Sequence, residues 1–105
     1  MNLAVLGATG SIGRSTLDVA ARHRDRYTVF ALAAHRSADR LLELARAHRP
    51  RLAVLSGMAE EAALRARFAE LGCELRFGAA ALEEVASDRR CEVVMAGIVG
   101  AAGLA

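Results

Sequence analysis

Three glycines near the start of the chain are spaced so that they can expose backbone amides to an anion. Gly7, Gly10 and Gly13 follow the apolar run Ala4-Val5-Leu6. Between a strand and a helix, the first glycine suits a tight turn, the second lets backbone amides approach a pyrophosphate, and the third lets the helix lie close to the sheet. The pattern therefore predicts a helix N-terminus that binds the phosphates of a dinucleotide. A glycine-rich turn with a purely structural role is the alternative.

Polar groups around these glycines extend the predicted site. The hydroxyls of Thr9 and Ser11 add two hydrogen-bond donors to the unpaired amides of the first helical turn. The spacing is GxxGxxG rather than the commoner GxGxxG, and this variant occurs in several families of nucleotide-dependent oxidoreductases. The motif therefore specifies a class of ligand and leaves the reaction open.

The residues His35-Arg36-Ser37 follow a second apolar run, Tyr27 to Ala34, and indicate which cofactor fits. NAD-binding domains typically have Asp or Glu here, roughly twenty residues past the glycines, to bind the ribose 2′-hydroxyl. A guanidinium and a hydroxyl suit a 2′-phosphate instead. We therefore predict that Arg36 and Ser37 bind NADP(H), and that Ser37 also caps the next helix. An ordinary loop arginine is the alternative for Arg36, and a surface histidine is the alternative to adenosine binding by His35.

Alternating strands and helices place both groups in one α/β domain. The predicted strands are Asn2–Leu6, Tyr27–Ala34, Arg51–Ser56, Cys73–Phe77 and Glu92–Ala96, and the predicted helices run from about Ser11 to His23, Ala38 to His48, Met58 to Leu71 and Ala79 to Ala86. This alternation predicts a Rossmann-like, doubly wound parallel sheet in three α/β/α layers, with strand order 3-2-1-4-5. In that order, Gly97 and Ile98 approach the middle or the nicotinamide end of the cofactor.

Charge and composition argue against several other classes of protein. Fourteen basic and 12 acidic residues give a net charge of +2, which does not indicate binding to nucleic acid or to an acidic membrane surface. No apolar run has the length of a membrane span. Cys73 and Cys91 lack CxxC spacing, and the chain starts on a strand without a signal segment, which predicts a reduced, cytoplasmic setting. We find no catalytic residues and no metal cluster.

The end of the chain indicates a domain that has been cut. The length of 105 residues suits a single domain, and Ala105 comes just after a strand exit that a helix ought to follow. We therefore expect residues 1–105 to form a truncated NADP(H)-binding domain.

Three stretches together resemble the N-terminal domain of the 1-deoxy-D-xylulose 5-phosphate reductoisomerase family. They are Leu6–Gly13 continued by Ser15–Val19, Val29–Ala34 followed by Arg36, and Met95–Leu104. The resemblance implies that Thr9, Gly10, Ser11 and Ile12 form the phosphate-binding turn, and that Arg36 and Ser37 face the adenosine phosphate. The family often has glycine at position 35, so His35 implies a different path for this loop.

The resemblance also implies an activity. The family rearranges 1-deoxy-D-xylulose 5-phosphate and reduces it with NADPH to 2-C-methyl-D-erythritol 4-phosphate, in non-mevalonate isoprenoid biosynthesis, with a divalent Mg or Mn ion polarising the substrate oxygens. It further implies a homodimer. The family's catalytic, metal-binding and C-terminal parts lie beyond residue 105, so we expect this chain to bind NADPH and, by itself, to catalyse nothing.

Two alternatives remain at this point. Other reductases with the GATGxxG sequence, such as semialdehyde dehydrogenases, share the first loop. A stand-alone NADP-binding or redox-sensing module belongs to a different class of protein, and a chain naturally complete at Ala105 would favour it.

Overall fold

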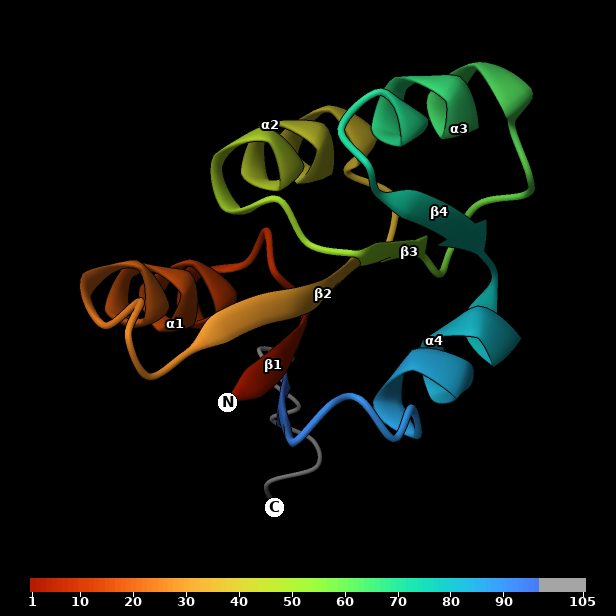
Figure 1. Cartoon of the computed structure of the whole chain (residues 1–105). Helices are drawn as coiled ribbons and strands as arrows, with labels where there is room; N and C mark the ends of the chain where they lie inside the picture. The colour runs from red at the N-terminus through yellow and green to blue at the C-terminus, as the bar shows by residue number, and fades with distance from the viewer. Residues whose placement is uncertain (97–105) are drawn as a thin grey trace.

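Five parallel strands form one sheet in the order β4-β3-β2-β1-β5 in the computed structural model, which describes residues 1–96 (Figure 1). The strands are β1 (Asn2–Leu6), β2 (Thr28–Ala34), β3 (Leu52–Leu55), β4 (Glu74–Phe77) and β5 (Val93–Ala96). The helices between them are α1 (Ser11–Arg22), α2 (Ala38–His48), α3 (Ala62–Ala69) and α4 (Ala79–Ala86). The predicted Rossmann-like α/β fold with a parallel sheet is confirmed.

The predicted strand order, 3-2-1-4-5, is wrong at its fourth strand. β4 pairs with β3 at the outer edge of the sheet, and β5 is the strand beside β1. The physical reason is that α3 packs on the same face as α1 and α2, so the right-handed crossover from β3 continues outward to the next position. The chain turns back only through α4, on the opposite face.

Helices cover the sheet on both faces, as the three-layer prediction requires (Figure 1). On one face α1, α2 and α3 bury Leu17, Leu41 and Phe68 in a cluster with side chains of the sheet. On the other face α4 contributes Ala81 and Val85 to a second cluster. The central strands are nearly all apolar because both of their faces are covered.

One helix, α3, starts later than predicted, and another, α1, leaves apolar side chains exposed. α3 begins at Ala62 rather than near Met58, and its first hydrogen bond is donated by the amide of Arg65 to the carbonyl of Glu61, at 3.2 Å. α1 buries Gly13, Leu17 and Ala20. On its other side Ile12 and Val19 are half exposed, at 49% and 51%.

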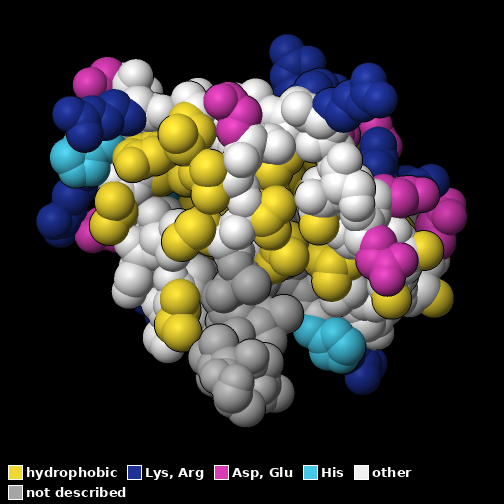
Figure 2. All heavy atoms as spheres, turned by 90° about the horizontal axis from the view of Figure 1, so that it is seen from below, with side chains coloured by type: hydrophobic (Ala, Val, Ile, Leu, Met, Phe, Trp, Pro, Cys, Tyr) yellow, Lys and Arg dark blue, Asp and Glu magenta, His cyan; other side chains and the backbone are white. Residues whose placement is uncertain are grey.

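Apolar side chains also gather on one surface of the molecule (Figure 2). The large apolar side chains that remain exposed within the described residues are Met1, Ile12, Val19, Val94 and Met95. None of the described helices is long and apolar enough to cross a membrane.

Candidate functional site

The turn between β1 and α1 has the tight geometry expected of a phosphate-binding loop. Gly7 has a φ of 69°, in the left-handed region that glycine adopts without strain. The amide of Gly10 donates to the carbonyl of Gly7 at 3.0 Å, which closes the turn. The amide of Ala8 donates to the carbonyl of Ala33 at 2.8 Å and ties the turn to the end of β2. The loop is thus held against the carboxyl edge of the sheet.

Gly13 has the close-packing role predicted for it, but its neighbour is the turn itself. A Cβ at this position would lie 2.7 Å from the Cα of Ala8 and would also collide with the carbonyl oxygen of Gly7. These are backbone atoms, which cannot rotate out of the way. The first turn of α1 therefore lies directly on the glycine turn, and this is possible because residue 13 has no side chain.

The N-terminus of α1 presents unpaired donors. The first intrahelical bond is donated by Arg14 to the carbonyl of Gly10, at 2.9 Å. Among the residues that the structure describes, the amides of Ser11, Ile12 and Gly13 have no acceptor. Gly10 is the N-cap residue and offers no side chain, and the first turn contains no acidic residue. The positive end of the helix is consequently available to an anion.

The predicted phosphate-selecting residues lie at the end of the neighbouring strand. β1 and β2 run side by side, with Leu6 opposite Ala33, so the segment after β2 lies next to the glycine turn. His35, Arg36 and Ser37 are all exposed there. The structure thus brings the two halves of the predicted site to one edge of the sheet.

Ser37 differs in one respect from its prediction. It is the N-cap residue of α2, and its carbonyl accepts the amide of Leu41 at 3.0 Å. Its hydroxyl, however, makes no capping hydrogen bond, because its ψ of 70° lies outside the extended conformation that capping usually requires. The hydroxyl is left available for a ligand.

Sequence reasoning missed two basic residues beside this edge. Arg14 and Arg40 line an open cleft of about 340 Å³ together with Thr9, Glu43 and Leu44. Each arginine lies in the first turn of its helix, where a positive charge opposes the helix dipole. Both arginines are exposed, so their charges are accessible from the cleft.

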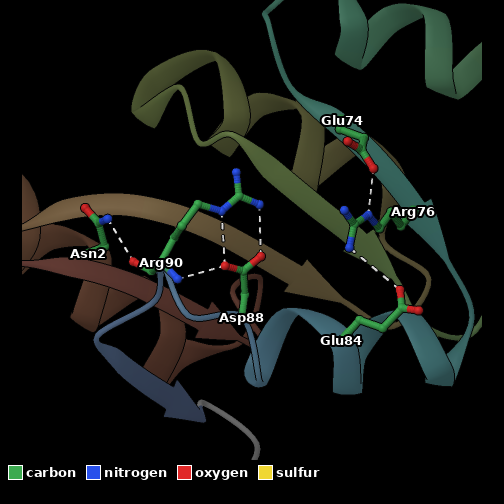
Figure 3. A network of polar contacts seen from close by, with 6 residues as sticks. All are labelled: Asn2, Glu74, Arg76, Glu84, Asp88 and Arg90. Carbon is green, nitrogen blue, oxygen red and sulfur yellow. Dashed lines mark hydrogen bonds and ion pairs between the residues drawn. The ribbon is translucent and has the colours of Figure 1, made fainter.

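A separate polar network lies at the opposite, amino edge of the sheet (Figure 3). The guanidinium of Arg90 bonds to both carboxylate oxygens of Asp88, at 3.1 and 2.9 Å, and these bonds lower the Asp88 pKa to about 2. The same guanidinium lies 4.9 Å from the centre of the Phe30 ring. The side-chain amide of Asn2 donates to the Arg90 carbonyl at 2.8 Å. The network holds the loop before β5 against β1.

Neither cysteine is placed for chemistry. Cys73 is buried, and burial followed by the charge of Glu74 raises its pKa to about 12. The Cys91 thiol donates to the carbonyl of Val93 at 3.2 Å, and partial burial raises its pKa. Both are free thiols in the described part of the chain.

Two further expectations concern the metal ligands and the residues that follow β5. Within residues 1–96, no group of three or more His, Cys, Asp or Glu side chains is arranged to hold a metal ion. The expectation that the metal ligands and catalytic residues lie elsewhere stays a prediction. Gly97 and Ile98, expected near the cofactor, lie outside the described residues.

Comparison with known proteins decides the family. The model of the 1-deoxy-D-xylulose 5-phosphate reductoisomerase family matches residues 3–105 of the chain. The chain belongs to this family. Membership favours the reductoisomerase interpretation over both a semialdehyde dehydrogenase and a stand-alone redox module.

Curated reductoisomerases from several bacteria are similar along nearly the whole chain. The protein from Ralstonia pickettii is 55% identical over 106 residues, which cover 99% of this chain and 27% of that protein. The protein from Pseudomonas putida is 53% identical over 104 residues, with 97% and 26% covered. The chain therefore spans about a quarter of the length of the curated relatives that it matches.

Solved reductoisomerase structures share the fold. The Zymomonas mobilis enzyme in complex with NADPH superposes with a TM-score of 0.76 at 40% identity, covering 83% of this chain and 23% of that one. A DOX-P reductoisomerase in complex with magnesium gives a TM-score of 0.84 at 41% identity, covering 98% and 26%. The β4-β3-β2-β1-β5 architecture is thus that of a reductoisomerase region.

Proposed function

We propose that this chain is the NADPH-binding domain of a 1-deoxy-D-xylulose 5-phosphate reductoisomerase. The observation that carries the proposal is the juxtaposition at the carboxyl edge of β1 and β2. There the open N-terminus of α1, packed on the glycine turn, lies next to Arg36 and Ser37. Family membership and the similarity to an enzyme solved with NADPH support it.

Each part of the site has a role that follows from its chemistry. The amides of Ser11 and Ile12, with the hydroxyl of Thr9, hold the pyrophosphate at the positive end of α1. Arg36 and the free hydroxyl of Ser37 hold the 2′-phosphate, which a carboxylate at this position would repel. When bound, NADPH supplies a hydride to the substrate. Gly7 and Gly13 keep the turn tight enough for these groups to converge.

The reaction belongs to the longer protein of which such a domain is a part. In the proposal that protein rearranges 1-deoxy-D-xylulose 5-phosphate and reduces it to 2-C-methyl-D-erythritol 4-phosphate. It works as a cytoplasmic homodimer on a phosphosugar, with magnesium or manganese as the divalent ion. The similarity to reductoisomerases solved with magnesium and fosmidomycin supports the metal, and the two free thiols suit a reducing compartment. Residues 1–96 provide no metal cluster, so we assign the metal no ligand here.

Calorimetric titration of the chain with NADPH and with NADH, each at two salt concentrations, tests the proposal. We expect NADPH to bind more tightly, with a preference that weakens as salt screens the contact between Arg36 and the 2′-phosphate. Equal binding of the two cofactors would remove Arg36 from the site. Binding of neither would contradict the proposal for this chain.

A further inference from the structure

Gly57, just after β3, lies directly against the side chain of His35. A Cβ built on Gly57 would collide with three atoms of the imidazole, Cε1, Nδ1 and Nε2. The ring therefore covers the Cα of Gly57, where the ends of β2 and β3 lie side by side. His35 is exposed as a residue, and its ring lies on the neighbouring loop.

Backbone hydrogen bonds join the same two segments. The amide of Gly57 donates to the carbonyl of His35 at 2.8 Å, and the amide of Ser56 donates to the carbonyl of Ala34 at 3.0 Å. These bonds continue the pairing of β2 with β3 beyond Leu55. The segment that leads into Arg36 is thus held both by its backbone and by the ring of His35.

The absence of a side chain at residue 57 leaves room for the ring of His35, whereas the backbone conformation there does not require glycine. The described glycines with positive φ are Gly7, Gly72 and Gly78, and Gly57 is not among them. A residue with a side chain can therefore adopt the backbone conformation of Gly57 without strain. The imidazole of His35 occupies the position that a Cβ at residue 57 would take, so only a residue without a side chain leaves the ring where it is.

We propose that Gly57 and His35 form a size-matched pair that positions Arg36 and Ser37 for the 2′-phosphate of NADPH. This inference rests on the proposed function and deepens it. Gly57 is a positioning residue in this account, because it acts through His35 and touches no cofactor. His35 contributes by packing on Gly57, which directs its ring toward β3.

The substitution Gly57→Ala tests the pair with little risk to the fold. The colliding atoms are the far end of an exposed side chain, which can rotate away, so we expect the thermal unfolding midpoint to stay close to that of the original chain. Displacing the ring removes one of the two contacts that hold the segment before Arg36, while the backbone hydrogen bond from Gly57 to His35 stays in place. We expect the Kd for NADPH to rise about two- to ten-fold, the usual cost of ordering one side chain on binding. The Kd for NADH, which has no 2′-phosphate, should not change.

A double-mutant cycle tests whether Gly57 and His35 act on NADPH binding through their mutual contact. His35→Gly alone should weaken NADPH binding to the same extent, and Gly57→Ala should have no further effect in the His35→Gly background, because the contact is already lost. Additive losses, equal losses for NADH and NADPH, or unchanged NADPH binding in Gly57→Ala would each overturn the inference. If the original chain binds neither cofactor, the proposed function fails, and this result is distinct from all three.

Discussion

The guanidinium of Arg36 is the group on which the choice between NADPH and NADH depends in this account. Arg36→Ala should weaken NADPH binding about 10- to 100-fold, because a hydrogen bond to a charged group contributes about 1.5–3 kcal/mol and each 1.4 kcal/mol is tenfold. NADH binding should stay within about two-fold of its original value, since it lacks the phosphate that charge-assisted bonds recognise. Calorimetric titration with both cofactors measures the two changes in affinity.

Arg46→Ala is the matched control for this substitution. Arg46 is exposed in the last turn of the same helix that Ser37 begins, so the change in net charge is identical and the location differs. Equal effects of the two substitutions would mean that only the overall charge matters, which would contradict a local contact with the phosphate.

Gly13 is the position where a single methyl group should damage both folding and binding. In Gly13→Ala the new Cβ meets the backbone of Gly7 and Ala8, so the turn or the helix must shift. We expect a loss of about 1–3 kcal/mol in the free energy of unfolding, typical of overpacking. NADPH and NADH should weaken together, because both use the pyrophosphate site. Urea denaturation and titration measure the two effects.

Ser15→Ala serves as the control on the same helix, because Ser15 is exposed. If Gly13→Ala were as stable as Ser15→Ala and bound both cofactors normally, α1 would not depend on its close approach to the turn.

At this scale the sequence offers a prediction of which residues form the site, but it does not predict the contacts between them. Glycine spacing and the absence of a carboxylate at His35-Arg36-Ser37 are local features that a one-dimensional pattern carries. The contact between His35 and Gly57 joins the ends of two strands, and no spacing rule reports such a contact. The same holds for the cleft between Arg14 and Arg40, which depends on how α1 and α2 pack.

At the scale of elements, the edge strand β4 explains why the predicted sheet order was wrong. Helix and strand alternation predicts that each crossover is right-handed, but it does not say where the chain reverses. The sequence does contain a clue, because Glu74 and Arg76 put charges on β4, as natural edge strands do. β5, the other edge strand in the described sheet, has the apolar sequence Val93-Val94-Met95 and pairs with β1.

The loop before β5 should make stability depend on pH at the acid end. The bonds from Arg90 lower the Asp88 pKa from an ordinary 3.8 to about 2. A carboxyl whose pKa is lowered by folding stabilises the fold above its ordinary pKa and loses this contribution as the pH falls through its folded value. Asp88→Asn should therefore be less stable than the original chain above about pH 4, and the two should converge near pH 2.

Unfolding by urea at a series of pH values measures this difference. Asp25→Asn, in the exposed turn before β2, is the control for the loss of one surface carboxylate. A constant difference between Asp88→Asn and the original chain across the whole pH range would show that the ion pair with Arg90 contributes nothing to stability.

At the scale of the whole molecule, the carboxyl ends and the amino ends of the strands have separate roles. The carboxyl edge carries the glycine turn and Arg36, whereas the amino edge carries the network of Asp88 and Arg90, which holds β5 beside β1 (Figure 3). Fold class and layers were predictable, because hydrophobic periodicity is distributed along the chain. The chain covers about a quarter of its relatives, so their remaining three quarters carry whatever completes the reaction in the proposal.

Mapping the bound cofactor onto backbone amides by NMR tests the central claim most directly. When NADPH is titrated into the labelled chain, we expect the amide resonances of residues 9–13 and 35–37 to shift together, with those of residues 88–90 unchanged. NADH should shift the amide resonances of residues 9–13 and leave those of residues 35–37 nearly unchanged. Shifts centred on the amino edge, or shifts at residues 35–37 without any at the glycine turn, would contradict a cofactor site at the carboxyl edge of β1 and β2.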